Sequence, residues 1–339
     1  MRPGERPAPV APKGAIGAAS RLAAVSVDLD ETTLYAALHG LGARASFDPH
    51  AVYERALPRL LAWAEARGVP LTLFAVGADL ARASNAAALA PFVRRGDEIG
   101  NHSLDHPYAL TRLPDRALVR QVREANDRIG AALGVRPEGF RAPGYAVDER
   151  LLAVIAEAGL RYDSSVFPCP TYYAAKLGAL ASLRLRGRRS RAIVDHPRVL
   201  LAPTKPYRPG SPYWTPGNGP LWELPVGVSG PLRLPFIGTA LALAPRPLLD
   251  HLVQNAARAR FINLELHGVD FLDERDGLSA LGPFQIDLRV PAERKLARFD
   301  RALSALRASG HHFVRLREVA DAHDVHDVHD VHDVHDAHD

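Results

Sequence analysis

The chain has 339 residues, which is enough for one large α/β domain or two small ones. Its hydrophobic content of 47% and charged content of 24% are typical of a globular protein, and its apolar runs are far too short to span a bilayer. The single cysteine, Cys169, excludes an intramolecular disulfide framework and fits a reducing compartment.

The formal net charge of +4 conceals an acidic C-terminal segment. Residues 321–339 carry seven aspartates and no lysine or arginine, so removing these seven charges leaves +11 on the rest of the chain. A basic body favours anionic partners such as a phosphate-bearing substrate or a membrane surface, although scattered arginines are also typical of solvated helix faces. No nucleic-acid-binding motif accompanies the charge, so we expect no nucleic-acid partner.

The two ends of the chain differ in composition from its middle. Residues 1–20 are rich in Pro, Gly and Ala, which predicts a disordered leader, and they lack the apolar stretch of a secretory signal. We therefore expect a cytoplasmic protein whose single domain covers residues 21–320. Residues 321–339 repeat a His-Asp-Val triplet, which predicts a low-complexity solvated tail, with weak metal binding as the alternative.

Strand and helix patterns alternate through the first half of the domain. Apolar β-prone runs at 23–28 and 71–76 predict buried strands, and a third, short strand is expected at 139–141. The alternation favours a parallel sheet or barrel. Helical periodicity covers four segments: 50–67, ending at Gly68; an Ala-rich segment ending near Arg95; 118–133; and 149–158, ending at Gly159.

Regular patterning is lost between residues 171 and 235. This segment is rich in prolines, arginines and aromatic residues, which predicts a long loop insertion over one end of the sheet. Its aromatics either stack on a substrate or pack the insertion itself, and Glu223 lies on an expected strand from which it could reach substrate. Periodicity returns with a strand at 261–266, a helix at 292–308 and a strand at 312–316.

The hexapeptide Asn101-His102-Ser103-Leu104-Asp105-His106 is the first candidate for chemistry. Histidines four residues apart lie on one face of a helical turn, so both imidazoles can reach a single point. Two imidazoles and one carboxylate are a common ligand set for catalytic zinc. The alternative is a pair of surface histidines at a helix start.

Polar residues also follow the expected strands. Asp28 and Asp30 end the first strand on the same side, and a divalent cation would compensate two close carboxylates. Arg141 follows the third strand and can hold a carboxylate, and the turn after it presents the backbone N–H of Tyr145 as an oxyanion donor. Turn-capping aspartates and an ordinary turn are the alternatives.

His267 ends the expected strand near residue 264. A histidine in that place is either a hydrogen-bonded core residue or a catalyst. Asp163, at the end of another short strand, could orient the imidazole by fixing its tautomer.

Together these motifs resemble the polysaccharide deacetylase family, which is carbohydrate esterase family 4 or the NodB-homology domain. The resemblance covers about residues 22–320, and the histidine hexapeptide is its most specific part. It implies an α/β fold, a distorted (β/α) barrel of seven or so units, with the insertion 171–235 over its active-site face. The implied activity is metal-dependent removal of acetyl groups from carbohydrates.

The resemblance also implies a role for each residue. Asp30, His102 and His106 would hold the metal, with zinc as the default and cobalt, nickel or manganese as alternatives. Asp28 would be the general base, and the N–H of Tyr145 would stabilise the oxyanion. His267, oriented by Asp163, would protonate the leaving amine, and Arg141 would brace the carboxylates.

Three departures from the family pattern concern the substrate. Leu29 separates two aspartates that are adjacent in many members, as in a branch that includes deacetylases of lipid-linked sugars and peptidoglycan-type enzymes. Ala142 and Gly144 surround Pro143 where many polymer-acting members have two prolines, and Ser164 replaces an aromatic residue. These changes leave the metal chemistry intact but argue against an extended polymer-binding groove.

The expected function is N-deacetylation of an amino-sugar or glycan, with anionic and lipid-linked forms among the candidate substrates. One alternative is a C–N hydrolase of the same fold that acts on a non-sugar amide or cyclic imide. The other is a non-catalytic carbohydrate-binding barrel, which the intact set Asp30, His102 and His106 disfavours.

Overall fold

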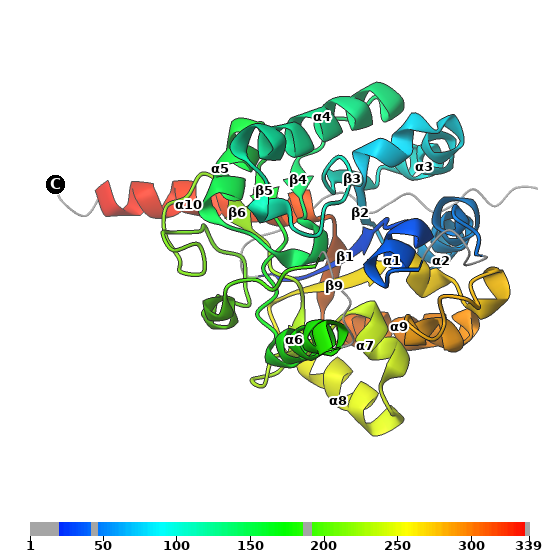
Figure 1. Ribbon diagram of the computed structural model, residues 1–339. Coiled ribbons are helices and arrows are strands. Elements are labelled where there is room, and N and C mark those ends of the chain that lie inside the picture. The colour runs from blue at the N-terminus through cyan, green and yellow to red at the C-terminus, as the bar shows by residue number, and fades with distance from the viewer. Residues whose placement is uncertain (1–19, 42–46, 186–191, 336–339) are drawn as a thin grey trace, which may run out of the picture.

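The computed structural model describes residues 20–41, 47–185 and 192–335 (Figure 1). The predicted leader, apart from Ser20, and the last four residues of the predicted tail lie outside this part of the chain. No helix within these ranges is long and apolar enough to cross a membrane.

A parallel sheet of short strands forms the centre of the molecule. Seven strands follow the order β9-β1-β2-β3-β4-β5-β6, and the eighth, β10, pairs with the first half of β1. Side chains meet across the interior: the Nδ2 of Asn263 on β9 lies 3.2 Å from the Oγ of Ser164 beyond β5. The sheet is therefore curled into a half-barrel, as predicted. The strands are β1 (Arg21–Asp28), β2 (Thr72–Ala75), β3 (Glu98–Asn101), β4 (Gly139–Phe140), β5 (Tyr162–Asp163), β6 (Trp222–Glu223), β9 (Phe261–His267) and β10 (His311–Val314).

Helices cover the outside of the half-barrel (Figure 1). Glycines with left-handed φ end α2, α3 and α4, because only glycine adopts that conformation without a steric penalty. The predicted helix 292–308 is observed with the same bounds, and a π-helical turn begins the predicted helix 50–67. The helices of this layer are α1 (Thr32–Leu38), α2 (Leu57–Arg67), α3 (Ala83–Arg95), α4 (Asp115–Leu133), α5 (Glu149–Glu157), α8 (Arg246–Ala256) and α9 (Ala292–Ala308).

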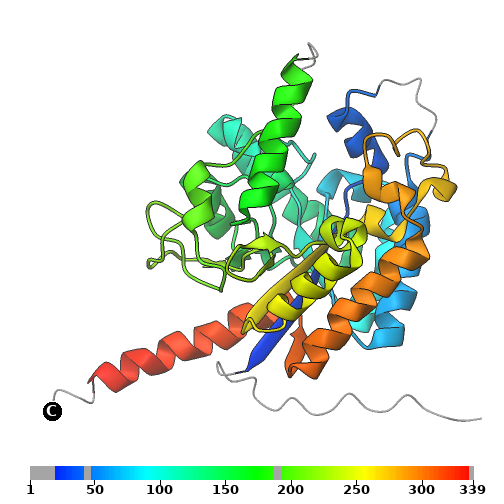
Figure 2. The same cartoon turned by 90° about the horizontal axis from the view of Figure 1, so that it is seen from below.

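The predicted insertion is more regular than its composition indicates. It begins with a helix, α6 (Pro170–Leu185), which projects from the body in Figure 2, and it contributes β6 to the main sheet. A two-stranded hairpin of β7 (Val228–Ser229) and β8 (Leu234–Pro235) and a short helix, α7 (Gly238–Leu243), then lead to α8. The expectation of a loop system was wrong for α6, whose alanines and leucines favour helix despite the proline that begins it.

Most aromatic side chains of the insertion pack the insertion itself. Tyr207 and Tyr213 are buried, and Trp214 stacks on the ring of His196 with centroids 4.4 Å apart. Tyr172 is the exception, because it lines the cavity described below. Glu223 is fully buried and does not line that cavity, so the expectation that it reaches substrate was wrong.

The C-terminal segment forms a helix, α10 (Leu316–His335), which leaves the body at its far end (Figures 1 and 2). Its first turns are attached to the insertion through Asp324. This carboxylate accepts hydrogen bonds from Trp222 Nε1 at 2.6 Å, Arg161 Nη2 at 2.8 Å and Arg208 Nη2 at 2.9 Å. The predicted boundary at residue 321 falls inside α10.

Candidate active site

The histidine hexapeptide forms a loop directly after β3 and not the predicted helical turn. Ser103 and His106 have φ angles of 66° and 53°. Side chains take over hydrogen bonds that a helix would make: Ser103 N donates to Asn101 Oδ1 at 2.7 Å, and His106 N donates to Ser103 Oγ at 3.1 Å. The loop still brings the two imidazoles together, with ring centroids 4.9 Å apart.

Asp30, His102 and His106 converge on one point. Oδ1 of Asp30 lies 3.1 Å from Nε2 of His102 and 3.2 Å from Nε2 of His106, and all three residues are buried. Among the described residues, none of these three atoms has a hydrogen-bond partner. Buried polar atoms without partners are costly, so their convergence fits a shared cation.

The surroundings prepare these groups to bind a metal. Nδ1 of His102 lies 2.8 Å from the carbonyl oxygen of Arg141, which places the proton on Nδ1 and leaves the Nε2 lone pair free. Burial alone would raise the pKa of Asp30, but the adjacent His106 and His102 hold it well below its usual range. A His₂Asp set of this kind suits zinc and related divalent ions.

Arg141 and Asp28 form a fully buried ion pair beside this cluster. Nη1 of Arg141 lies 2.7 Å from Oδ1 of Asp28, while Nε and Nη2 donate to Ser164 O and Ser26 Oγ at 2.8 and 2.9 Å. Oδ2 of Asp28 lies 3.8 Å from Nε2 of His102. The guanidinium thus fixes the Asp28 carboxylate next to the candidate metal site, the geometry expected of a bracing residue.

Asp163 does not contact His267. It accepts a hydrogen bond from Ser165 Oγ at 2.7 Å and shares a buried contact with Glu223. Burial raises the pKa of Asp163 and, with the added charge of Asp163, raises that of Glu223 far more. The prediction that Asp163 orients His267 was therefore wrong, because the carboxyl group of Asp163 contacts that of Glu223 instead.

Glu265 occupies the place predicted for Asp163. Its Oε1 lies 2.9 Å from Nδ1 of His267, and the carboxylate is fully buried. Burial alone would lower the pKa of His267, but the negative charges of Glu265 and Asp30 raise it well above its usual value. The sequence carries a signal for this pair, because residues two apart on a strand point to the same face.

Asp28, Glu265 and His267 are also close enough together to hold a cation. Arg141 already supplies a positive charge to this group, at 2.7 Å from Asp28. The neighbouring set is therefore the better candidate for a metal, because its carboxylate, Asp30, lies against imidazoles and not against a guanidinium.

Tyr145 lies at the site, but its backbone N–H is already engaged. Residues 143–145 form a tight turn in which Tyr145 N donates to Ala142 O at 3.0 Å. Gly144 and Tyr145 both have positive φ, at 66° and 61°. The prediction of a free oxyanion donor is corrected accordingly: the turn uses this N–H, and the Tyr145 side chain lines the cavity.

A cavity of about 400 Å³ opens onto these residues. Asp28, Asp30, His102 and His267 lie at one end of it, and side chains from α1, α6, α7 and the β8 hairpin form its walls. Its volume is in the range that accommodates a small molecule.

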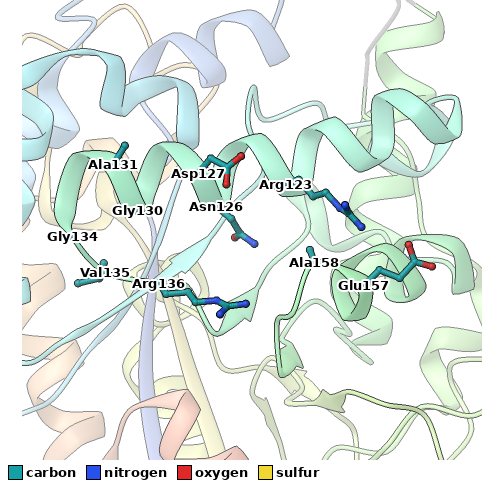
Figure 3. A pocket seen from close by; sticks show the side chains of 10 residues that line it. All are labelled: Arg123, Asn126, Asp127, Gly130, Ala131, Gly134, Val135, Arg136, Glu157 and Ala158. Carbon is teal, nitrogen blue, oxygen red and sulfur yellow. The ribbon is translucent and has the colours of Figure 1, made fainter.

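A larger groove, of about 780 Å³, lies between α4 and α5 (Figure 3). Its lining includes the C-terminal end of α4, which precedes the start of β4, so the groove lies at the opposite end of the strands from the histidine loop. It contains no histidine, and active sites of parallel barrels form at the carboxyl ends of the strands. Its lining residues are Arg123, Asn126, Asp127, Gly130, Ala131, Gly134, Val135, Arg136, Glu157 and Ala158.

Comparisons with known proteins agree with this geometry. Residues 45–162 match the polysaccharide deacetylase family model, a stretch that contains the histidine loop, Arg141 and Tyr145. Over 103 residues the chain is 31% identical to chitin deacetylase 1 of Cryptococcus neoformans var. grubii, a match that covers 30% of this chain and only 21% of that relative.

A solved structure shows the same fold, and a second is similar to a lesser degree. A Mycobacterium smegmatis protein assigned to the polysaccharide deacetylases superposes with a TM-score of 0.54 at 19% identity, covering 89% of this chain and 90% of that one. A family 4 carbohydrate esterase pseudoenzyme from Bacillus anthracis superposes with a TM-score of 0.48 at 12% identity, over 89% of this chain and 66% of that one. Residues 45–162 thus match the polysaccharide deacetylase family, carbohydrate esterase family 4, and the chain has the half-barrel fold of a solved structure assigned to it.

Proposed function

We propose that this protein is a metal-dependent hydrolase that removes the acetyl group from an N-acetylated amino-sugar. One observation carries the proposal: three buried ligand atoms, on Asp30, His102 and His106, converge without other partners beside an Arg-paired carboxylate. Zinc is the metal we expect there. When bound, it would polarise the acetyl carbonyl and lower the pKa of a water molecule.

Asp28 is the group we propose as general base. Its Oδ2 is the oxygen turned toward the candidate metal site, because Oδ1 is held by Arg141 at 2.7 Å. A positioned carboxylate of this kind can accept a proton from the attacking water. Arg141 holds the other oxygen of the carboxylate in place during that transfer.

His267 is the proposed general acid. The charges of Glu265 and Asp30 raise its pKa and so favour the protonated imidazole, whose Nε2 lies 4.0 Å from Asp30 Oδ2 at the lining of the cavity. Glu265 holds the Nδ1 side of the ring. The proton on Nε2 is then available to the departing nitrogen, which cannot leave as an amide anion.

Tyr145 closes the cavity beside these groups. An oxyanion role for its N–H requires that substrate exchange the 3.0 Å hydrogen bond to Ala142 O. The Tyr145 side chain forms part of the cavity wall regardless of that exchange.

The direct test is acetate release from N-acetylhexosamines and their oligomers by metal-stripped and zinc-restored protein. Activity should depend on zinc and should be abolished in His102→Ala and Asp28→Ala. His312→Ala removes an exposed histidine far along the chain and serves as the matched control. Full activity in either site variant would contradict the mechanism, and bound zinc without activity on any substrate would favour a non-catalytic barrel.

A second candidate function uses the same groups on a non-sugar amide or cyclic imide. The apolar walls of the cavity favour it over a polymer-acting enzyme, because they offer few partners for sugar hydroxyls. Ureides and imides assayed beside the N-acetylhexosamines would separate the two functions.

A further inference from the structure

The walls of the active-site cavity are almost wholly apolar. The charged or ionisable groups Asp28, Asp30, His102 and His267 all lie in the reaction cluster. The remaining lining residues are tyrosines, threonines, glycine, proline and aliphatic residues, without a lysine, arginine, glutamine or asparagine. They are Tyr35, Leu38, Tyr108, Gly144, Tyr145, Thr171, Tyr172, Ala175, Pro235, Ile237, Thr239, Ala240 and Leu243.

Such walls are poorly suited to enclose a chain of several sugar rings. Each buried hydroxyl group needs a hydrogen-bond partner, and an unsatisfied one costs about 1–3 kcal/mol. The four tyrosines and two threonines of the lining offer few partners for a second or third sugar unit, whereas the aliphatic side chains remove apolar substrate surface from water at no such cost.

Two tyrosines supply polar atoms close to the reaction cluster. Tyr35 and Tyr145 are each 6% exposed, and among the described residues neither hydroxyl has a hydrogen-bond partner. The ring of Tyr35 lies 6.4 Å from that of His267. These buried hydroxyls are the polar atoms of the wall nearest to the head of a substrate, such as the amide or ester to be cleaved.

The apolar wall continues from the cluster to the surface. Leu38 on α1, Ala175 on α6 and Leu243 on α7 surround the cavity, and Leu243 is 37% exposed. On the same surface-projecting α6, Leu177 is 46% exposed. An apolar group that enters beside the cluster can thus extend outward along aliphatic side chains.

We infer that this cavity binds an unbranched alkyl chain, so that the substrate is an amphiphile with its amide or ester head at the metal cluster. The inference rests on the proposed function, whose site it extends. The chain has two chemical sources: it belongs to an acyl group longer than acetyl, or it is attached to the sugar as an alkyl or lipid substituent.

Two substrate series distinguish these sources with zinc-loaded full-length protein. The first is a set of N-acyl glucosamines with acyl groups of two to eight carbons, and the second is a set of alkyl glycosides of N-acetylglucosamine from methyl to octyl. Each buried methylene should raise kcat/KM about fourfold, from about 0.8 kcal/mol per methylene, until the cavity is full. A rise in one series identifies the source of the chain.

Two variants test the assignment of the wall. Leu243→Asp should remove most of the gain per methylene, while Leu248→Asp, which changes a similarly exposed leucine on α8, should leave it intact. Ala240→Phe should fill the cavity and move the optimum to a shorter chain. Calorimetry of octyl glycoside binding to metal-stripped protein gives a readout that is independent of turnover, and tighter binding than for the methyl glycoside is expected.

The outcomes separate this inference from the proposed function. Hydrolysis of the acetyl substrates whose rate does not rise with chain length in either series, with equal octyl and methyl affinities, would overturn the alkyl site and leave the deacetylase intact. Chain-length-dependent binding without hydrolysis of any substrate would overturn the function and support the alkyl site.

Discussion

Replacing Glu265 with glutamine tests which carboxylate orients and charges the proposed general acid, His267. In the structure Glu265 Oε1 lies 2.9 Å from His267 Nδ1, and the side chain is fully buried. Glutamine has nearly the same shape but no charge, and it can turn either its oxygen or its NH₂ group toward Nδ1. The variant therefore loses the main attraction that raises the pKa of His267 and the fixed orientation of the ring.

The size of the effect follows from the step that His267 performs. General acid catalysis contributes about 10²–10⁴-fold, so kcat/KM for an N-acetyl amine should fall by that factor, or by about 3–5 kcal/mol of transition-state stabilisation. An aryl ester such as 4-nitrophenyl acetate has a leaving group that needs no proton. Its hydrolysis should change by less than about threefold, because the metal and Asp28 are untouched.

Asp163→Asn is the matched comparison, since the sequence alone indicates Asp163 for this role. It should leave the ratio of amide to ester hydrolysis unchanged, because Asp163 contacts Ser165 and Glu223 and not His267. Zinc content and the unfolding midpoint of each variant show whether the site remains intact. Equal losses on amide and ester in Glu265→Gln, or a selective amide loss in Asp163→Asn only, would refute the reasoning.

Three further predictions concern the metal, a buried charge and pH. His106→Ala should weaken zinc binding by more than about 100-fold in a competition titration with a chelator, because loss of even an outer partner of a ligand typically costs 10–100-fold. Arg141→Met leaves Asp28 as an unpaired buried charge and should lower the free energy of unfolding by about 3–5 kcal/mol in chemical denaturation, with partial recovery in the double variant with Asp28→Asn. Burial, with the charge of Asp287, raises the pKa of Asp270 to about 7. The folded protein therefore favours the protonated form of Asp270. This contribution to the free energy of unfolding is complete below about pH 4 and is lost as pH rises to about 7. Asp270→Asn keeps an oxygen that can accept the hydrogen bond from His267 N. In the wild type the free energy of unfolding should fall by about 1.4 kcal/mol per pH unit in that window, and in the variant this fall should disappear. An equal fall in both proteins would contradict the assignment.

The strand and helix pattern was predictable where periodicity is strong. The spacing of apolar residues predicts the helix 292–308, and continuous apolar runs predict the buried strands that end at Asp28 and His267. The helix α6 was not predictable by the same means, because it projects from the body and has little of the one-sided apolar pattern on which such predictions rest (Figure 2).

The metal ligands were predictable, but the backbone that presents them was not. Spacing places two histidines near one point in a helix, and the structure achieves the same result with a loop. The loop depends on hydrogen bonds from the Asn101 and Ser103 side chains, which compete with helix in a way that residue spacing does not reveal.

Charge balance inside the half-barrel explains why Glu265 and not Asp163 accompanies His267. Buried charges are tolerated mainly in pairs, and near the site Asp28 is paired with Arg141 and Glu265 with His267. Asp163 and Glu223 lie against each other, and their raised pKa values keep at least one of them protonated. A proton-sharing carboxyl pair cannot supply the full negative charge that an imidazolium requires. The order of motifs along the chain does not record this balance, which arises only when β5, β6 and β9 close around Arg141.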